Sequence, residues 1–136
     1  MTPITTFTAF TAALQALDVT GVKRKYDHVP PSLADLPASW IQLLESDESP
    51  LTFDGGGGWP VMRAQHVVAV RPTAQGTAEE NWTKTLTLMD AIADALRAVA
   101  AGTLGRQKVS WRIRMAVVTV ADIDHWGVIS DVVANG

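Results

Sequence analysis

The chain has 136 residues, of which 47% are hydrophobic and 18% are charged. This length and composition are typical of one globular domain, residues 1–136, and exclude a disordered chain. The formal net charge of −3 gives the whole protein no attraction for nucleic acid or anionic lipid, although a local basic face is compatible with it. The absence of cysteine excludes disulfides and thiolate chemistry.

The N-terminal sequence MTPITTFTAFTAAL lacks the basic segment that begins a signal peptide. No apolar run reaches the roughly 18 residues that a membrane-spanning helix needs. We therefore expect a soluble protein that is not exported and has no membrane partner.

A first helix is predicted to begin at Thr2-Pro3, where a hydroxyl cap precedes a proline in the first turn. Gly21 lies just beyond its end. Helical spacing gives this segment one apolar stripe, made of Ile4, Phe7, Phe10, Leu14 and Leu17.

Residues 22–37 contain three prolines, which exclude a long helix and favour an irregular, extended path. Residues 39–45 (SWIQLLE) are predicted to form a short strand. The connection at residues 46–60 contains four consecutive glycines, whose ordering is costly in conformational entropy. We expect this loop to be mobile and to become ordered only against a partner.

A strand is predicted at residues 61–71, and alternation places His66 on its core face. A long helix follows, because Thr77 and Glu80 have the form of a capping box and Gly102 provides a stop. Leu88 falls beside the apolar stripe of this helix. The stripe consists of Trp82, Leu86, Met89, Ile92, Ala93, Leu96, Val99 and Ala100.

Strands at residues 109–120 and 125–134 are predicted to form a hairpin through a short turn at 121–124. Trp111 and Val117 share the face of the first strand that is expected to be apolar. The order of elements predicts an α+β fold with two helices on one face of a mainly antiparallel, roughly four-stranded sheet. The other face would be mixed, with Arg63, Gln65, Arg71, Arg112 and Arg114 beside apolar residues.

The glycine run TFDGGGGWP (52–60) raises the question of a phosphate-binding loop. Such a loop needs a lysine, a hydroxyl group and the N-terminus of a following helix. Here Gly58 is followed by Trp59-Pro60 and a strand. We therefore predict no nucleotide site and no cofactor.

The histidines, His28, His66 and His125, are the remaining nitrogen ligands for zinc. Asp122 and Asp124 precede His125, but aspartates are common in hairpin turns, and zinc needs three or four ligands. We favour the turn, and a hydrogen-bonded core role for His66. No GxSxG or HExxH motif occurs. The sequence predicts no metal site, no catalytic residue and no enzyme activity.

Candidate interface residues come from the basic run at 23–25, the glycine loop, the strand arginines and the tryptophans. The basic run is either a solvated loop or an electrostatic contact. Tryptophans near connections or edges serve either as interface anchors or as caps of the core. The candidates are Lys23, Arg24, Lys25, Trp40, Gly55, Gly56, Gly57, Gly58, Trp59, Arg63, Arg71, Arg112, Arg114 and Trp126.

Two parts of the chain carry a family resemblance. They are YDHVPPSLADLPASWIQL (26–43) and a closing pattern of long amphipathic helix, polar loop and hairpin that ends in HWGVISDVVANG. Together they resemble the tail terminator, or tail completion, proteins of long-tailed bacteriophages and related tail-like particles. The resemblance covers nearly the whole chain and rests on a proline-rich extended segment rather than on catalytic residues. No residue is matched to a lumen motif of that family.

The resemblance implies an α+β subunit that forms a hexameric ring on the last layer of the tail tube. Its implied partners are copies of itself, the tail tube protein and the head–tail connector proteins. The implied location is the head-proximal end of the virion tail, after assembly in the host cytoplasm. DNA would pass through the ring lumen without specific binding.

Two other classes stay open at this point. One is a small α+β ligand-binding or regulatory module, expected to be a dimer, and the other is a small enzyme. Fold alone does not decide function. A measurement of the mass in solution distinguishes a ring from a dimer.

Overall fold

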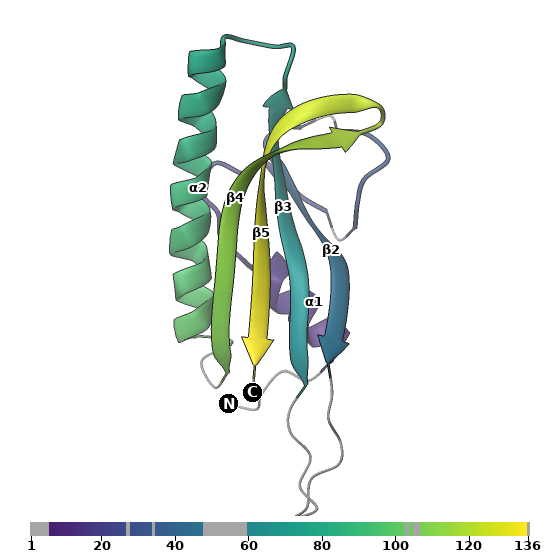
Figure 1. Ribbon diagram of the computed structural model, residues 1–136, viewed down its shortest axis with the longest axis vertical. Coiled ribbons are helices and arrows are strands. Elements are labelled where there is room, and N and C mark those ends of the chain that lie inside the picture. The colour runs from purple at the N-terminus through teal and green to yellow at the C-terminus, as the bar shows by residue number, and fades with distance from the viewer. Residues whose placement is uncertain are drawn as a thin grey trace, which may run out of the picture.

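The computed structural model describes residues 6–26, 28–33, 35–47, 60–102, 104 and 107–135. It confirms the predicted α+β class, with two helices and a mixed sheet of five strands, rather than about four, in this part of the chain (Figure 1). The elements in chain order are α1 (Phe7–Gln15), β1 (Arg24–Lys25), β2 (Ala38–Asp47), β3 (Val61–Pro72), α2 (Ala78–Ala101), β4 (Lys108–Val120) and β5 (Ile123–Asn135).

The additional strand is β1, which lies in the segment predicted to be irregular. It pairs in parallel with Ala38 and Ser39 of β2, while the other neighbouring strands of the described sheet are antiparallel. The order across the sheet is β1-β2-β3-β5-β4, so β4 forms one edge. Two residues carry no periodic signal, which is why the sequence did not predict β1.

Strand β2 is longer than predicted and extends through Ser46 and Asp47, which were expected to belong to the loop. Its pairing with β3 shifts after Gln42, so that Leu43 and Leu44 form a bulge, with Leu43 at φ 53°. The remainder of the predicted mobile loop, including Gly55–Gly58 and Trp59, lies outside the described residues.

Helix α1 begins at Phe7, because Thr6 is its N-cap and accepts a hydrogen bond from the backbone N–H of Ala9. The predicted start at Thr2-Pro3 lies outside the described residues. Phe10, Leu14 and the following Leu17 are buried as the spacing predicts, whereas Phe7 is half exposed.

Helix α2 begins with the predicted capping box of Thr77 and Glu80 and is capped at its end by Gly102. Its buried face is rotated from the predicted stripe, so that Trp82 is 55% exposed and Leu86 40% exposed. Asn81 is buried in their place, because its side-chain amide donates to the carbonyl oxygen of Gln75. The buried residues of α2 are Asn81, Thr85, Leu88, Ile92, Ala95, Leu96 and Val99.

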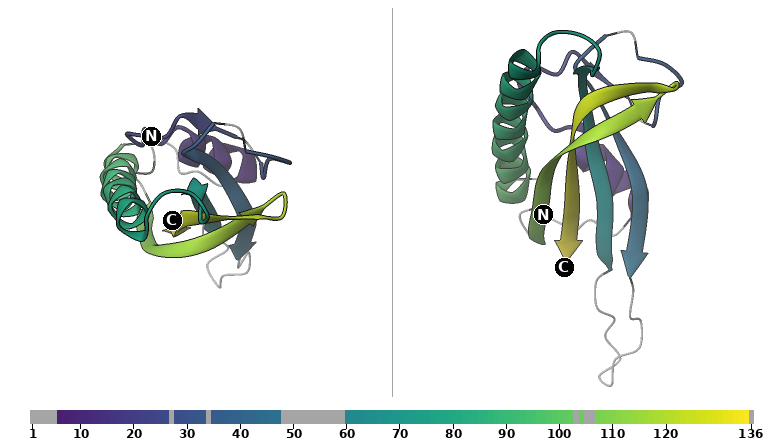
Figure 2. Two further views of the ribbon diagram at one scale, coloured as in Figure 1. Left: turned by 90° about the horizontal axis from the view of Figure 1, so that it is seen from above. Right: turned by 45° about the horizontal axis from the view of Figure 1, so that its top comes forward.

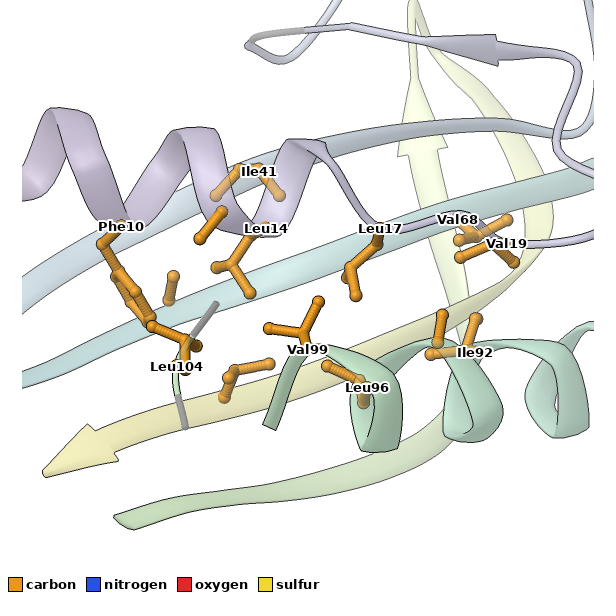
Figure 3. Packing of buried hydrophobic residues seen from close by; sticks show 14 of the residues in the cluster. Phe10, Leu14, Leu17, Val19, Ile41, Val68, Ile92, Leu96, Val99 and Leu104 are labelled. Atoms are coloured by element: carbon orange, nitrogen blue, oxygen red, sulfur yellow. The ribbon is translucent and has the colours of Figure 1, made fainter. Parts of the chain in front are cut away.

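Both helices cover the same face of the sheet, as predicted. Figure 3 shows Leu14 of α1 and the following Leu17 pointing toward Val99 of α2, and Phe10 pointing toward Leu104. Side chains of β2, β3 and β5 close this core from the sheet side, and they include Ile41, Met62, Ala64, Val68, Val128 and Val132.

A second, smaller core lies on the opposite face. The β4–β5 hairpin bends out of the sheet (Figures 1 and 2), and its Val120 packs with Trp40, Val67 and Ala69. Ala121 and Asp122 form the two-residue turn, with φ of 52° and 63°. The predicted hairpin is therefore confirmed, although β5 starts at Ile123. The same bend leaves Val117, which was expected on the apolar face, 56% exposed.

Candidate functional site

The face of the sheet that lies away from the helices carries a chain of hydrogen bonds that crosses four strands. Trp40 Nε1 donates to Gln42 Oε1 (3.0 Å), and Gln42 Nε2 donates to Gln65 Oε1 (2.9 Å). Gln65 Nε2 donates to Asp131 Oδ1 (2.9 Å), and Arg114 Nε donates to Asp131 Oδ2 (3.3 Å). The strand register brings these side chains together from β2, β3, β5 and β4, and their mutual hydrogen bonds hold this face in one arrangement.

Three of the four arginines that were predicted on this face lie there. Arg63 forms an ion pair with Asp47 of β2, and Arg114 pairs with Asp131. Arg112 is exposed and forms no ion pair with any described residue.

The placement of Arg71 on this face was wrong. A bulge at Val70 shifts the register, so that Ala69 is opposite Gly127 but Arg71 is opposite Trp126. The shift turns Arg71 toward the helices, where its guanidinium lies 3.8 Å from Glu80 of α2. The alternation of side chains counted from residue 61 does not reveal the extra residue at Val70.

Beyond the short strand β1, which carries Arg24 and Lys25, opposite charges collect at opposite edges of the sheet face that lies away from the helices. The β4 side carries Lys108, Arg112 and Arg114, whereas the β2 side carries Glu45 and Asp47. The net charge of the chain gives no sign of this separation, because it appears only when the strands are placed in order.

The basic run Lys23–Lys25 is exposed and contributes Arg24 and Lys25 to β1. Arg24 lies 3.7 Å from Asp35 and stacks over the ring of Tyr26, with 5.0 Å to the ring centroid. Part of its charge is therefore satisfied within the chain.

The tryptophan candidates divide into buried and partly buried residues. Trp40 is only 1% exposed, so it caps the second core and is not an exposed interface anchor. Trp126 is partly buried against the main core. Sequence reasoning placed Trp82 in the core and missed it as an exposed aromatic residue, because size and spacing favoured burial.

Exposed large apolar side chains occur at several places, which include Phe7, Val29, Val117 and Ile123, and two pairs of them lie on different sides of the molecule. Leu43 is 69% and Leu44 40% exposed on β2, and Trp82 and Leu86 are exposed on α2. Figures 1 and 2 place α2 beside β4, away from β2. The leucine pair was missed because its exposure results from the bulge.

An open cleft of about 710 Å³ lies between the first half of α2 and the segments around residues 20–23 and 36–37. Its walls carry charges of both signs, including Lys23, Arg71, Glu80 and Lys84, and Leu36 and Leu88 add apolar surface. Four separate segments build this cleft, so no local motif predicts it.

His66 is buried on the helix-covered face of β3, as alternation predicted. Burial, and secondarily the charge of Lys25, lowers the pKa of His66 to about 4, so the imidazole is neutral at pH 7. The expected hydrogen bond is absent at Nδ1, which has no partner in the described chain. Ser130, opposite His66 on β5, has an equally unpartnered Oγ.

His125 is also buried, and its Nδ1 donates to the carbonyl oxygen of Ile123 (2.9 Å). Asp124 accepts from the hydroxyl of Thr119 (2.6 Å), which ties it to the hairpin. No group of three or more potential metal ligands is found among the described residues. None of the described helices is long and apolar enough to cross a bilayer.

Comparison with known proteins adds no assignment, since no protein-family model and no curated protein sequence matches the chain.

Proposed function

We propose that this protein is a structural subunit that assembles with copies of itself into a ring. The observation that carries the proposal is the exposure of two unlike apolar patches on different sides of one subunit. Leu43 and Leu44 form the patch on β2, and Trp82 and Leu86 form the patch on α2. Exposed apolar side chains of this size that gather beside one another mark interaction surfaces.

Two unlike patches favour a head-to-tail contact over a two-fold one. In a two-fold dimer the same surface meets itself, so one patch is covered and the other stays exposed. In a closed ring each subunit uses one patch toward each neighbour, and both patches are covered.

The resemblance of residues 26–43 and of the C-terminal hairpin to tail terminator proteins supports a particular ring. On this proposal the ring is hexameric, ends the tail tube of a phage or a tail-like particle and joins the tube to the head connector. The chain has no catalytic role in this proposal. The mixed face of the sheet is the surface offered to DNA or to a neighbouring subunit.

Antibody labelling of intact particles tests this location. Gold-labelled antibodies raised against the purified chain are expected to bind at the junction of head and tail in electron micrographs. Pre-incubation of the antibody with the purified chain is the control and should remove the label. Label along the tail or on the head, or none on particles opened at the junction, would contradict the proposed location.

A second candidate function is favoured by the 710 Å³ cleft beside α2. A dimeric ligand-binding module would use such a cleft, since its charges of both signs and the apolar surface of Leu36 and Leu88 suit a small polar molecule. Ligand binding to the folded state raises the melting temperature with ligand concentration. A stable dimer whose melting temperature rises with one metabolite, and falls back in Lys84→Glu, would support this candidate over the ring.

A further inference from the structure

The described sheet ends in two strand edges that have no strand neighbour. β4 is the last strand in the order, and all thirteen of its residues pair only with β5. On the other side, β1 covers only Ala38 and Ser39 of β2. The stretch from Trp40 to Asp47 therefore has no described strand on its outer side. Such edges carry backbone donors and acceptors that a further strand can pair with.

The two edges run in opposite directions. β2 is antiparallel to β3, β3 to β5, and β5 to β4, so β2 and β4 point opposite ways. Rotating a copy of the subunit about an axis parallel to the strands leaves the direction of each strand unchanged. Placing β4 of one copy beside β2 of a rotated copy therefore gives an antiparallel pair, and repeating the operation leads to a ring.

The edges also carry complementary charges at the same level of the sheet. When the strand register is followed across β3 and β5, Asp47 lies level with Lys108, and Glu45 lies level with Ser110. Arg112 is two residues further along β4, on the same face as Ser110. Lys108, Arg112 and Glu45 form no ion pair with any described residue. These charges are available to a partner that brings the opposite sign.

We infer that the β4 edge of one copy docks on the β2 edge of the next copy, with Lys108 and Arg112 facing Glu45 and Asp47. This inference rests on the proposed ring and names the surfaces that close it. The bulge at Leu43 and Leu44 limits the strand pairing to the residues on either side of it. It also places two exposed leucines where the neighbouring copy covers them.

The charges select this contact over pairing of β4 with β4. A two-fold β4–β4 contact centred on Arg112 would place this arginine against the same arginine of the other copy, with Lys108 and Arg114 nearby on both strands. Like charges placed against each other across an interface cost several kcal/mol and exclude wrong partners. A second copy is the occupant because this one chain supplies both complementary edges.

Charge reversal is the first test. Arg112→Glu and Glu45→Arg should each weaken subunit association by about tenfold or more, and the double variant should restore most of the association. Arg97→Glu, an exposed reversal on α2, is the matched control and should leave association unchanged. Circular dichroism checks that each variant folds. Single reversals without effect, or a double variant no better than either single one, would overturn the inference.

Cross-linking of the unmodified protein is the second test. A mixture of ¹⁴N and ¹⁵N protein is treated with a carbodiimide, which joins a lysine amine to a carboxylate in contact with it. β2 and β4 are separated by three strand spacings, about 14 Å, so a Lys108–Glu45 or Lys108–Asp47 link must join two chains. Mixed-isotope peptides of these pairs support the docking.

The two proposals fail in different ways. If a ring forms without these cross-links and is unaffected by the charge reversals, the docking of β4 on β2 is contradicted and the proposed ring is not. An unmodified protein that forms no ring contradicts the proposed function and the docking together.

Discussion

Glu45 and Arg112 stand at opposite edges of one sheet face, carry opposite charges and have no ion-pair partner in the described chain. Between them, Gln65 and Asp131 are joined by a hydrogen bond of 2.9 Å. The middle of the face is thus satisfied within the subunit, whereas Glu45 and Arg112 at its edges are not. The borders of this face are therefore the places where a partner can pair with charged side chains.

The exposed Trp82 is expected to contribute to assembly more than to folding. Replacing a surface side chain changes unfolding free energy by about 0.5 kcal/mol or less, so Trp82→Ser should keep its melting temperature. Self-association should fall by about tenfold if the indole is an interface anchor. Sedimentation velocity measures the association, with Ala98→Ser on the same helix as the control. Unchanged association in Trp82→Ser would remove α2 from the interface.

Asp131 is the centre of the hydrogen-bond chain across the sheet. Asp131→Ala removes the acceptor of Gln65 and the partner of Arg114, and should lower the unfolding free energy by about 1–2 kcal/mol. Asp94→Ala, which breaks an exposed pair with Arg97, should cost about 0.5 kcal/mol or less. Urea unfolding compares the two variants. Equal losses would show that the network adds nothing to the sheet.

The lowered pKa of the buried His66 predicts that the folded protein loses stability in acid. Its pKa is about 4 in the folded chain and 6.5 in the ordinary, unfolded state. Between these values the unfolded chain binds more protons, so the stability present above pH 6.5 is lost as the pH falls toward 4. The full loss is about 3 kcal/mol.

Unfolding in urea at several pH values from 4 to 7 measures this contribution. His66→Leu removes the titrating group, so the difference in unfolding free energy between the two proteins should change with pH. His28→Leu, an exposed histidine in the loop after β1, is the control. A constant difference between the natural protein and His66→Leu would contradict the buried neutral imidazole.

Gly127 is predicted to be essential for the bend of the hairpin. A Cβ at this position would lie 2.6 Å from Val118 Cγ2 and 3.0 Å from the carbonyl oxygen of Val68. Gly127→Ala should therefore destabilise the fold by about 1–3 kcal/mol. Adding Val118→Ala should recover part of the loss, since it removes one of the two clashes. A fully stable Gly127→Ala would show that the hairpin has room at this point.

The regular parts of the fold were predictable from local chemistry. The capping box at Thr77 and Glu80 and the alternation around His66 appear where the sequence indicated, and the hairpin turn lies within the predicted residues 121–124. Each depends on residues within a few positions of one another, so spacing alone carries the information.

The errors arise where tertiary contacts override spacing. The bulge at Val70 moves Arg71 to the other face, and nothing in the alternating run marks it. Asn81 replaces Trp82 in the core because its amide finds the carbonyl of Gln75, which lies outside the helix. The charge separation between β2 and β4 depends on strand order, which a linear reading does not contain.

Native mass spectrometry of the purified chain over a range of concentrations tests the central claim most directly. The proposed ring predicts one closed oligomer, a hexamer, that grows with concentration without a dominant dimer. Monomers or a two-fold dimer at every concentration would contradict the ring.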